Sequence, residues 1–490
     1  MERRDTTVKR VSQFKLSPEA CKAGPFKGYE RLDWINSAAT KRPEERCKNF
    51  MHHFSVNNLR QAFRQLDGNK AVGIDKITKK KYRENLEQNL ESLADEIHRG
   101  GWRPKPSREV LIPKPQGGTR PLAIGCLEDK IVQLLGAKIL EAIYEPLFHR
   151  HSYGFRPGRN THQALARLYK VIEQRPDNCV VVEMDIEKFF NSMDHGLLIE
   201  LIEKKIGDQS FLRLIRRILR NSILSEKGEL VQTERGSPQG APISPILANI
   251  YLHYVLDEWF EQNYGKDGEF IRYADDAVFI FTDVEVATRF KTALEERVKN
   301  MGKLNLNADK SGMFKFDSRQ PEGPLLFVGF SLYWANLSGG RRKQKKLLKV
   351  KTAPKKLAKC IEAFTDWIKE TRYKKRLDDL WELAATKLRG HYQYYGVSFN
   401  RPKLNHYYYT AIRALFKWLN RRSQKRSFTL ERFNRRLMYN PLPKPTAGSA
   451  LLDITLGIIP KLKHKPRSRM RKSRTYGSNR SAGWQQTAFT

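Results

Sequence analysis

Two hydrophobic periodicities alternate along the chain and predict a mixture of helices and strands. Apolar residues recur at helical spacing in long segments, whereas shorter runs rich in Val, Ile and Phe have the pattern of strands and hairpins. Together they predict an α+β fold. The expected helices cover residues 56–66, 79–100, 129–147, 197–206, 210–223, 243–264 and 284–302. The expected strands and hairpins cover residues 106–124, 179–185, 222–236, 269–281, 304–316 and 327–334.

The two ends of the chain differ from this central part. Residues 1–55 are polar and weakly periodic, which predicts a basic N-terminal arm with little regular structure. Residues 441–490 form a basic tail. Its part 456–490 contains few apolar side chains, so we expect it to become ordered only on nucleic acid. Between them, residues 341–440 have apolar faces opposite basic ones. The helices expected there cover residues 353–370, 377–396, 404–427 and 429–438.

The net charge indicates the class of partner. The 490 residues include 91 Lys and Arg against 53 Asp and Glu, which gives a net charge of +38. Most of the excess lies after residue 340, where 38 basic residues stand against 8 acidic ones. Such an excess is far more than solubility requires, so it points to a polyanionic partner, which is nucleic acid.

Cysteine usage and hydropathy indicate the compartment. The five cysteines include no Cys-x-x-Cys pair, which argues against a disulfide framework or a zinc finger and favours a reducing compartment. No apolar run approaches 18 residues, so no membrane span is predicted, and the N-terminus lacks the apolar core of a secretory signal. We therefore expect a cytoplasmic protein, with an organelle as the less favoured alternative.

Candidate chemistry begins with two adjacent acids, Asp275 and Asp276, in the segment EFIRYADDAVFIF. Apolar side chains at Phe270, Val278 and Ile280 predict two short strands that close around the acids. One interpretation is a polar hairpin turn, because Asp is common in turns. The other is a metal site, because carboxylates flanked by apolar side chains need cations to offset their burial.

A third acid favours the metal site. The segment CVVVEMD predicts a strand that ends in the carboxylate of Asp185. Carboxylates at strand ends and turns are what a two-metal phosphoryl-transfer site requires, since two Mg2+ ions take oxygen ligands there. Asp185, Asp275 and Asp276 are therefore the candidate ligands of two ions, one activating a 3′-hydroxyl and the other a triphosphate.

Basic residues near such a site could bind phosphates. Lys114 and Arg120 flank the glycine turn of a predicted hairpin, where they could hold a triphosphate, although a solvated hairpin face is the simpler interpretation. Arg156 and Arg159 stand among aromatic residues in SYGFRPGRN, a mixture that suits template backbone and bases. An aromatic core with exposed arginines is an equal alternative. Three nearby histidines, at 149, 151 and 162, lack a fourth ligand type and favour surface or template contacts over a metal site.

Four further positions are candidates for substrate contact. Phe190, five residues after the strand acid, could pack under the sugar of an incoming nucleotide and exclude a 2′-hydroxyl, or could be an ordinary core residue. Gln239 lies in the constrained loop RGSPQG, where it can face a substrate. Lys310 stands at a predicted turn, and Gly329 lies in a predicted hairpin that a primer could approach closely.

The C-terminal helices combine aromatic and basic side chains. Tyr392, Tyr395, Arg421 and Arg422 offer stacking together with positive charge, which suits RNA. A helical bundle with solvated cations would show the same pattern. The large excess of basic residues after residue 340 favours RNA.

Taken together, these segments resemble the reverse transcriptase and maturase proteins encoded by group II introns, over roughly residues 56–455. Eight blocks occur in the family's order: GNKAVGID, IPKPQGGTRPLAI, SYGFRPGRNTHQAL, VVEMDIEKFF, RGSPQG, FIRYADD, LNLNADKSG and FVGF. The resemblance implies a right-hand polymerase with fingers and an antiparallel palm sheet in residues 56–340. It also implies a helical thumb or maturase domain in residues 341–440 and a nucleic-acid-binding tail in residues 441–490.

The resemblance further implies an activity and its partners. The expected activity is RNA-directed DNA polymerisation with two Mg2+ ions, using an intron RNA as template, DNA as primer and target, and dNTPs, together with help in intron splicing and mobility. Departures from the family pattern at Ala123, Gly125 and Asn191 concern fine positioning. The implied metal ligands are Asp185, Asp275 and Asp276. The implied dNTP contacts are Lys114, Arg120, Phe190, as a steric gate, and Gln239.

Alternatives remain within the resemblance. No cysteine follows Cys360, so we expect the chain to lack the C-terminal endonuclease domain, rich in Cys and His, of larger family members. A relative domesticated for DNA repair or phage defence would keep every block and lose its intron. A maturase active only in splicing would instead have a vestigial polymerase, and the intact set of three acids argues against it.

Overall fold

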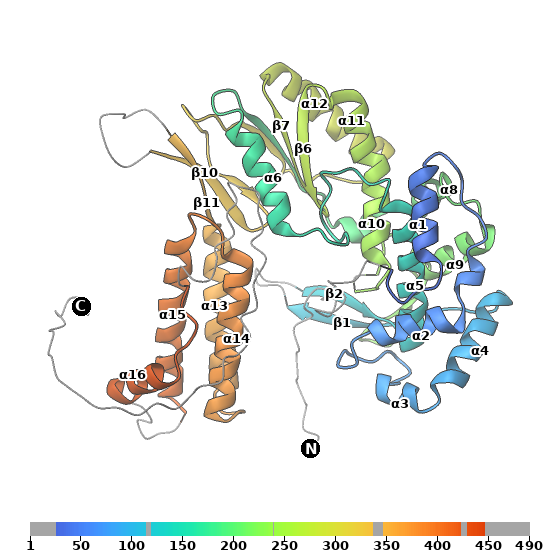
Figure 1. The fold of residues 1–490 in the computed structure, drawn as a ribbon, viewed down its shortest axis with the longest axis horizontal. Helices are drawn as coiled ribbons and strands as arrows, with labels where there is room; N and C mark the ends of the chain where they lie inside the picture. The colour runs from blue at the N-terminus through green and yellow to red at the C-terminus, as the bar shows by residue number, and fades with distance from the viewer. Residues whose placement is uncertain (1–25, 114–118, 239, 337–345, 423–428, 446–490) are drawn as a thin grey trace, which may run out of the picture.

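The computed structural model describes residues 26–113, 119–238, 240–336, 346–422 and 429–445 (Figure 1). These residues form three sheets and three hydrophobic cores, with a helical bundle at one side. No helix within the described ranges is long and apolar enough to cross a membrane.

The central sheet is antiparallel and is covered on both faces. Its strands lie in the order β6 (Gly268–Tyr273), β7 (Asp276–Phe281), β3 (Val180–Met184) and β8 (Gly312–Lys315). Successive side chains of β3 and β7 alternate between two hydrophobic cores, one on each face. Because both faces are buried, these strands are apolar along most of their length, in the segments VVV and AVFIF.

One face of the central sheet is covered by α5 (Leu127–Tyr144), α10 (Ser244–Leu252) and α12 (Val284–Glu296), and the other by α6 (Thr161–Glu173). In α5, 15 of 18 residues are buried, so this helix is a core element rather than an amphipathic cover. Helix α1 (Leu32–Lys41) packs on α5 through Leu32 and Ile35. Residues 26–55 are therefore folded onto the core, unlike the unstructured arm expected there.

A second sheet has the strand order β2-β1-β4-β5 and forms the fingers. The hairpin of β1 (Ser107–Pro113) and β2 (Thr119–Ile124) is antiparallel, and β4 (Ile223–Leu224) joins β1 in parallel. The short strand β5 (Leu230–Val231) completes it. The helices and the 3-10 turn around this sheet and the neighbouring core are η1 (Met51–His53), α2 (Val56–Gln65), α3 (Lys79–Glu84), α4 (Leu86–His98), α7 (Phe189–Ser192), α8 (His195–Glu203) and α9 (Gln209–Leu219).

Three expected helices are interrupted, and one expected strand is reduced to a single bridge. The helix predicted over residues 79–100 breaks at Asn85, whose φ of −121° and ψ of 43° are not helical; Asn is a weak helix former because its side chain competes for backbone groups. The helix predicted over residues 243–264 contains a π-helical segment, His253–Asp257, before α11 (Glu258–Tyr264). A similar segment, Arg297–Met301, ends α12. The first strand expected in residues 304–316 is reduced to one bridge between Leu306 and Ile186.

The third sheet joins the palm to the helical bundle. Its strands β9 (Leu325–Phe327), β10 (Phe330–Asn336) and β11 (Lys346–Thr352) are antiparallel. The domain boundary expected at residue 340 therefore falls between two paired strands of this sheet. The bundle follows, with α13 (Pro354–Thr371), α14 (Leu377–Tyr395), α15 (Arg401–Leu419) and α16 (Leu430–Tyr439) around a core of its own (Figure 1).

This arrangement confirms the predicted fold class, a right-hand polymerase with fingers, an antiparallel palm and a helical thumb. The expected basic tail cannot be compared with it, because residues 446–490 lie outside the described residues.

The thumb core contains a buried histidine that should make its stability depend on pH. His391 stacks on Tyr407 with ring centroids 3.7 Å apart, and burial lowers its pKa to about 4. The unfolded chain takes up this proton near pH 6.5, whereas the folded chain takes it up only near pH 4, so stability falls as the pH drops below about 6.5. Between pH 7.5 and pH 5.5 the loss from this group is about 1 kcal/mol.

The His391→Phe variant keeps an aromatic ring for stacking and removes the titration. Its unfolding free energy should therefore fall less than that of the parent chain between these two pH values. Urea unfolding at both pH values gives the difference, to which the other histidines contribute equally in both proteins. Parallel pH profiles for the two proteins would contradict the assignment.

Candidate active site

Three acids converge at one end of the palm sheet because of strand register. Met184, the last residue of β3, pairs with Ala277 of β7, and Tyr273 of β6 pairs with Asp276. Asp185 therefore leaves β3 beside Asp276, while Asp275 lies in the tight turn between β6 and β7. The two acidic segments are about 90 residues apart in sequence, and the structure brings them together as predicted.

A loop after α12 holds Asp185 in place. The backbone N–H of Asp185 donates to Ser311 Oγ at 3.1 Å, and its carbonyl accepts from the N–H of Asn307 at 2.8 Å. Lys310 donates from Nζ to Asp185 Oδ2 at 2.9 Å, and this lysine is otherwise exposed. The predicted turn at Lys310 therefore exists, and its ammonium group lies on the strand acid.

Asp276 is electrostatically strained. The surrounding protein raises its pKa to about 6, first by desolvation and then through the charges of Asp275 and Asp185. Lys356 from the start of α13 and Lys310 oppose this shift. The Asp276 carboxylate remains accessible to solvent at the surface, so the desolvation comes from protein atoms around it rather than from enclosure. A cation at this position would relieve the repulsion among the three acids.

The donor set suits a hard divalent cation. Carboxylate oxygens are the ligands that Mg2+ prefers, and the Lys310 ammonium on Asp185 shows that the site attracts positive charge. Across the described ranges, however, no group of three or more His, Cys, Asp or Glu is arranged to hold a metal ion. A cation bound by Asp185 would take the place of the Lys310 ammonium group.

A fully buried ion pair fixes the turn that carries Asp275 and Asp276. Arg272, in β6, donates from Nε to Asp257 Oδ1 at 2.8 Å and from Nη2 to Oδ2 at 2.5 Å, and both side chains are completely buried. Its Nη1 donates to Asn249 Oδ1 at 3.1 Å and to the carbonyl of Ala274 at 3.0 Å. The guanidinium group thus binds the residue immediately before the two acids.

The backbone around this turn is unusually tight. Ala274 has a φ of 58°, a left-handed conformation that few L residues adopt. Gly154 approaches so closely that a Cβ atom there would lie 2.2 Å from the Ala274 nitrogen. Asn249 donates to the Gly154 carbonyl at 2.8 Å, so the same polar network holds both segments. Asp257 comes from the π-helical segment, a local irregularity that often accompanies functional sites.

Among the four candidate nucleotide contacts, the side chain described by the structure is that of Phe190. Phe190 is half-buried, edge-on to Phe155 at 6.3 Å, and its carbonyl accepts from the N–H of Ser237 at 2.7 Å. Gly236 meets the same helix so closely that a Cβ would lie 2.7 Å from Asn191 Cα. A cavity of about 190 Å³ separates this loop from the fingers hairpin, lined in part by Pro121, Ala123, Asn191, Ser237 and Pro238.

Two predicted nucleotide contacts cannot be placed. Lys114 and Gln239 lie outside the described residues. For Arg120 only the backbone is described, and it pairs with Ile112 in the fingers hairpin, as the predicted turn required.

Arg156 occupies a different position from the one expected of a template contact. It is buried, and its five N–H groups donate to the Glu145 carboxylate and to the carbonyls of Glu145, His149 and Ser152. No donor remains for a phosphate, because this arginine anchors the segment after α5. Arg159 is half-buried over the Tyr153 ring at 5.5 Å.

Gly329 and Tyr395 meet each other rather than open solvent. Gly329 has a φ of 87°, and a Cβ there would lie 3.2 Å from the Tyr395 hydroxyl. Tyr395 is buried against Phe330, and the half-buried Tyr392 packs against the same core. These two tyrosines therefore join the thumb to the third sheet, which leaves little of either ring for base stacking.

Arg421 and Arg422 lie at the far end of α15. The Arg421 guanidinium lies 5.2 Å from the centre of the Trp418 ring, which also has Arg372 at 5.0 Å. Arg422 donates to the carbonyl of Lys375 at 2.9 Å. The stacking and charge expected in the thumb are present around Trp418.

Four residues near the acids were missed by the sequence analysis. Arg272 and Asp257 form the buried pair, Lys356 opposes the charge on Asp276, and the Tyr394 hydroxyl donates to the Val328 carbonyl at 2.9 Å. Of these four residues, Arg272 alone could have been recognised from the sequence. An arginine at a core-facing position of an apolar strand needs a buried acid as its partner.

Comparisons with known proteins indicate the class of the protein. The family model described as "Reverse transcriptase (RNA-dependent DNA polymerase)" matches residues 112–332. "Protein YkfC" of Escherichia coli K12 is 31% identical over 278 residues, which is 49% of this chain and 71% of that protein. The protein is therefore of the reverse transcriptase class.

Relatives associated with introns narrow the assignment. "Group II intron-encoded protein LtrA" of Lactococcus lactis subsp. cremoris is 39% identical over 178 residues, 36% of this chain and 29% of that protein. A protein in a cob intron of Schizosaccharomyces pombe is 48% identical over 160 residues, 32% of this chain and 19% of that protein. These matches span less than a third of either relative. The chain belongs to the family of reverse transcriptases and maturases encoded by group II introns.

The Arg272–Asp257 pair can be tested by separating its charge from its volume. Arg272→Met leaves Asp257 as an uncompensated buried charge and should cost roughly 3–5 kcal/mol of stability. The double variant Arg272→Met/Asp257→Leu removes both charges and should regain most of that loss. Urea unfolding measures both effects, and Arg289→Met, at an exposed position of α12, is the control.

The same double variant should not restore the turn. It still lacks the donor to the Ala274 carbonyl, so amide hydrogen exchange in the peptide that spans residues 273–277 should stay faster than in the parent chain. A single variant as stable as the parent, or a double variant with parental exchange, would refute this role for Arg272.

Proposed function

We propose that this protein is an RNA-directed DNA polymerase that uses two divalent metal ions and also binds a structured group II intron RNA to assist its splicing and mobility. The observation that carries the polymerase proposal is the register that sets Asp185 beside the Asp275–Asp276 turn at one end of the palm sheet. The match of residues 112–332 to the reverse transcriptase model supports it.

The three acids would hold a primer 3′-hydroxyl and the α-phosphate of a dNTP through the bound cations. Two Mg2+ ions, when bound, supply the charge that favours attack by the hydroxyl and departure of pyrophosphate. Asp185 would exchange its contact with Lys310 for a metal ion, which frees that ammonium group to meet phosphate oxygens. Arg272 keeps the turn in place throughout, because it is buried and its bonds do not depend on substrate.

The nucleotide would enter between the fingers hairpin and the palm. The Phe190 ring would face the sugar. The loop from Gly236 to Pro238, whose Ser237 N–H binds the Phe190 carbonyl, forms one wall of the cavity beside the fingers hairpin and supports this proposal. A ring in that place rejects a 2′-hydroxyl by steric clash, so the substrate would be a dNTP. Lys114, Arg120 and Gln239 are the proposed contacts to the triphosphate and base, on the basis of the family resemblance.

Replacing a proposed metal ligand should abolish activity without unfolding the protein. Asp276→Asn removes a carboxylate whose pKa is raised first by desolvation and then by the charges of Asp275 and Asp185, so stability should be unchanged or slightly higher. Primer extension on an RNA template with Mg2+ should fall by roughly a thousandfold.

Asp309→Asn provides a matched control, because it makes the same change of charge. Asp309 is exposed and lies in the loop that holds Asp185. This variant should keep activity within about twofold. Equal activity in the Asp276→Asn protein and the parent would end the two-metal proposal.

The RNA partner is the second part of the proposal. The helical bundle presents aromatic and basic side chains around Trp418, where four cations, Lys369, Arg372, Lys417 and Arg421, surround one indole ring. Arrangements of this kind suit unstacked bases and the phosphates beside them. The intron-encoded relatives are what point to an intron RNA.

The partner can be identified by recovering the protein from its native cells at high salt and sequencing the RNA that remains bound. High salt weakens non-specific contacts steeply, because each phosphate contact releases a counterion. We expect one dominant structured RNA that matches the sequence around the gene. A mixed population of unrelated transcripts would contradict the intron partner and favour the domesticated alternative, with the polymerase proposal unaffected.

A further inference from the structure

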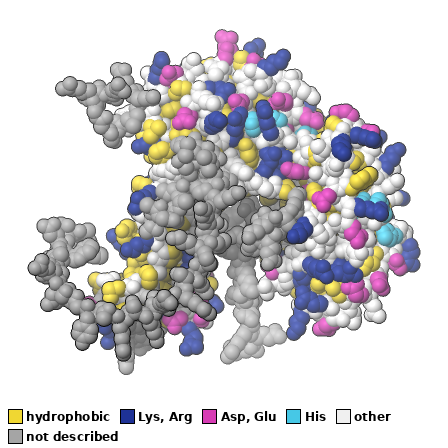
Figure 2. Space-filling view, viewed as in Figure 1, with side chains coloured by type: hydrophobic (Ala, Val, Ile, Leu, Met, Phe, Trp, Pro, Cys, Tyr) yellow, Lys and Arg dark blue, Asp and Glu magenta, His cyan; other side chains and the backbone are white. Residues whose placement is uncertain are grey.

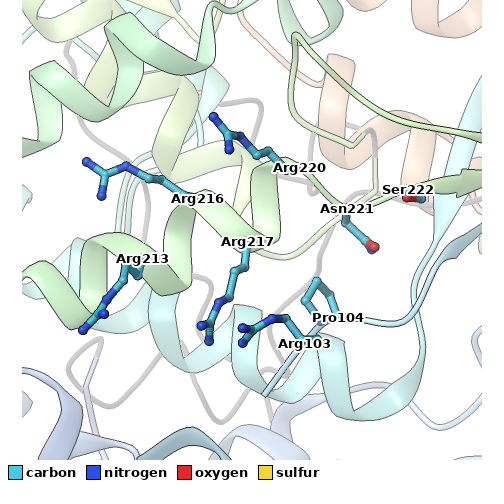
Figure 3. Close-up of a pocket in the computed structure, with 8 residues that line it drawn as sticks. All are labelled: Arg103, Pro104, Arg213, Arg216, Arg217, Arg220, Asn221 and Ser222. Carbon is cyan, nitrogen blue, oxygen red and sulfur yellow. The ribbon is translucent and has the colours of Figure 1, made fainter. Parts of the chain in front are cut away.

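A pocket in the fingers is lined by five arginines. It has a volume of about 370 Å³ and lies between α9 and the residues that lead into β1 (Figure 3). Arg213, Arg216, Arg217 and Arg220 come from α9 and its C-terminal cap, and Arg103 comes from the opposite wall. None of these residues belongs to the proposed polymerase site.

The sequence of α9 places these arginines on one face. Positions 213, 216, 217 and 220 are spaced by three, four and seven residues, which is one side of a helix, while all the apolar residues of α9 face the core. Arg213 and Arg220 are exposed. Helix α9 is therefore strongly amphipathic, and arginine dominates its outer side.

The positive charges are poorly compensated. None of the eight lining residues is acidic, and among the described residues Arg216 forms an ion pair with Glu203 at 2.7 Å. Arg217 donates to the carbonyls of Gly100 and Trp102, so it is fixed beside Arg103. Desolvation and the charges of Arg103 and Arg213 lower the pKa of Arg217.

The helix end explains part of this cluster but not all of it. Arginines in the last turn interact favourably with the partial negative charge at a helix C-terminus, and this accounts for Arg216, Arg217 and Arg220. It does not account for Arg213, which stands earlier in the helix, or for Arg103, which comes from another segment. A pocket that gathers cations from two segments is suited to an anion with several charged oxygens.

We infer that this pocket binds backbone phosphates of an RNA strand at a site separate from the three acids. The inference rests on the proposed RNA partner for the nature of the strand, but not on polymerase activity. In Figure 1, α9 lies at the fingers side of the molecule, away from the bundle formed by α13, α14 and α15. The RNA would thus contact the protein at two distant surfaces, the thumb and the outer fingers.

The test uses the full-length chain with Arg213→Gln and Arg220→Gln. These two arginines are exposed and outside the carbonyl contacts that fix Arg217, so the fold should survive. The probe is a closed RNA dumbbell duplex, which has no 3′ end and cannot be extended. At about 0.15 M salt its affinity should fall roughly tenfold, and the slope of log K against log salt should fall by about 1.5.

Arg289→Gln with Lys299→Gln is the matched control, because it makes the same change of charge at exposed positions on another part of the molecule. The dumbbell should bind this variant within about twofold of the parent. Equal losses in both variants would show general charge attraction and overturn the pocket. A greater loss on a DNA dumbbell than on the RNA one would overturn RNA as the occupant.

Primer extension on a short primer–template separates this inference from the proposed function. The pocket variant should keep parental extension, whereas Asp276→Asn should lose extension and still bind the RNA dumbbell. If the parent chain extends no primer but the pocket variant still binds the dumbbell more weakly than the control does, only the polymerase proposal fails.

Discussion

The Arg272–Asp257 ion pair is the interaction on which the arrangement of the palm depends. Both side chains are completely buried, so each charge is tolerable only because the other is present. The pair connects β6 to the π-helical segment after α10, and the same guanidinium group reaches the carbonyl of Ala274. The positions of Asp275 and Asp276 therefore depend on the bond from Arg272 to Ala274, which lies in the protein interior.

Local patterns explain why much of this could be predicted from the sequence. The acids were found because each follows or separates short apolar strands, and a strand pattern with an acid at its end is visible within a few residues. Glycine turns and helical periodicity predicted most of the elements for the same reason. Asn85 and the two π-helical segments were missed because each covers five residues or fewer next to segments of clear helical periodicity.

The remaining errors concern contacts between distant segments. Arg156 was expected at the surface, but it is enclosed by Glu145 and by three carbonyls, which no local pattern shows. Tyr395 was expected to stack on RNA, but its hydroxyl packs against the turn at Gly329. Residues 26–55 seemed unstructured because their few apolar residues are widely spaced, yet Leu32 and Ile35 are enough to seat a helix on α5. Tertiary burial, not periodicity, decides these cases.

The way the thumb is rooted has a mechanical consequence. Helix α14 contributes Leu388 to the core of the bundle and Tyr395 to the core beneath the palm sheet, and α15 likewise contributes Tyr408 and Leu404. Both helices are thus fixed at the end near the Val328–Gly329 turn, where they pack against the palm. The remainder of each helix can move as a rigid lever about that end. A lever of 19 residues is about 28 Å long, so a rotation of about ten degrees at the clamped end displaces its tip by about 5 Å. A small adjustment of packing at the rooted end can therefore move the far end of the thumb by several ångströms.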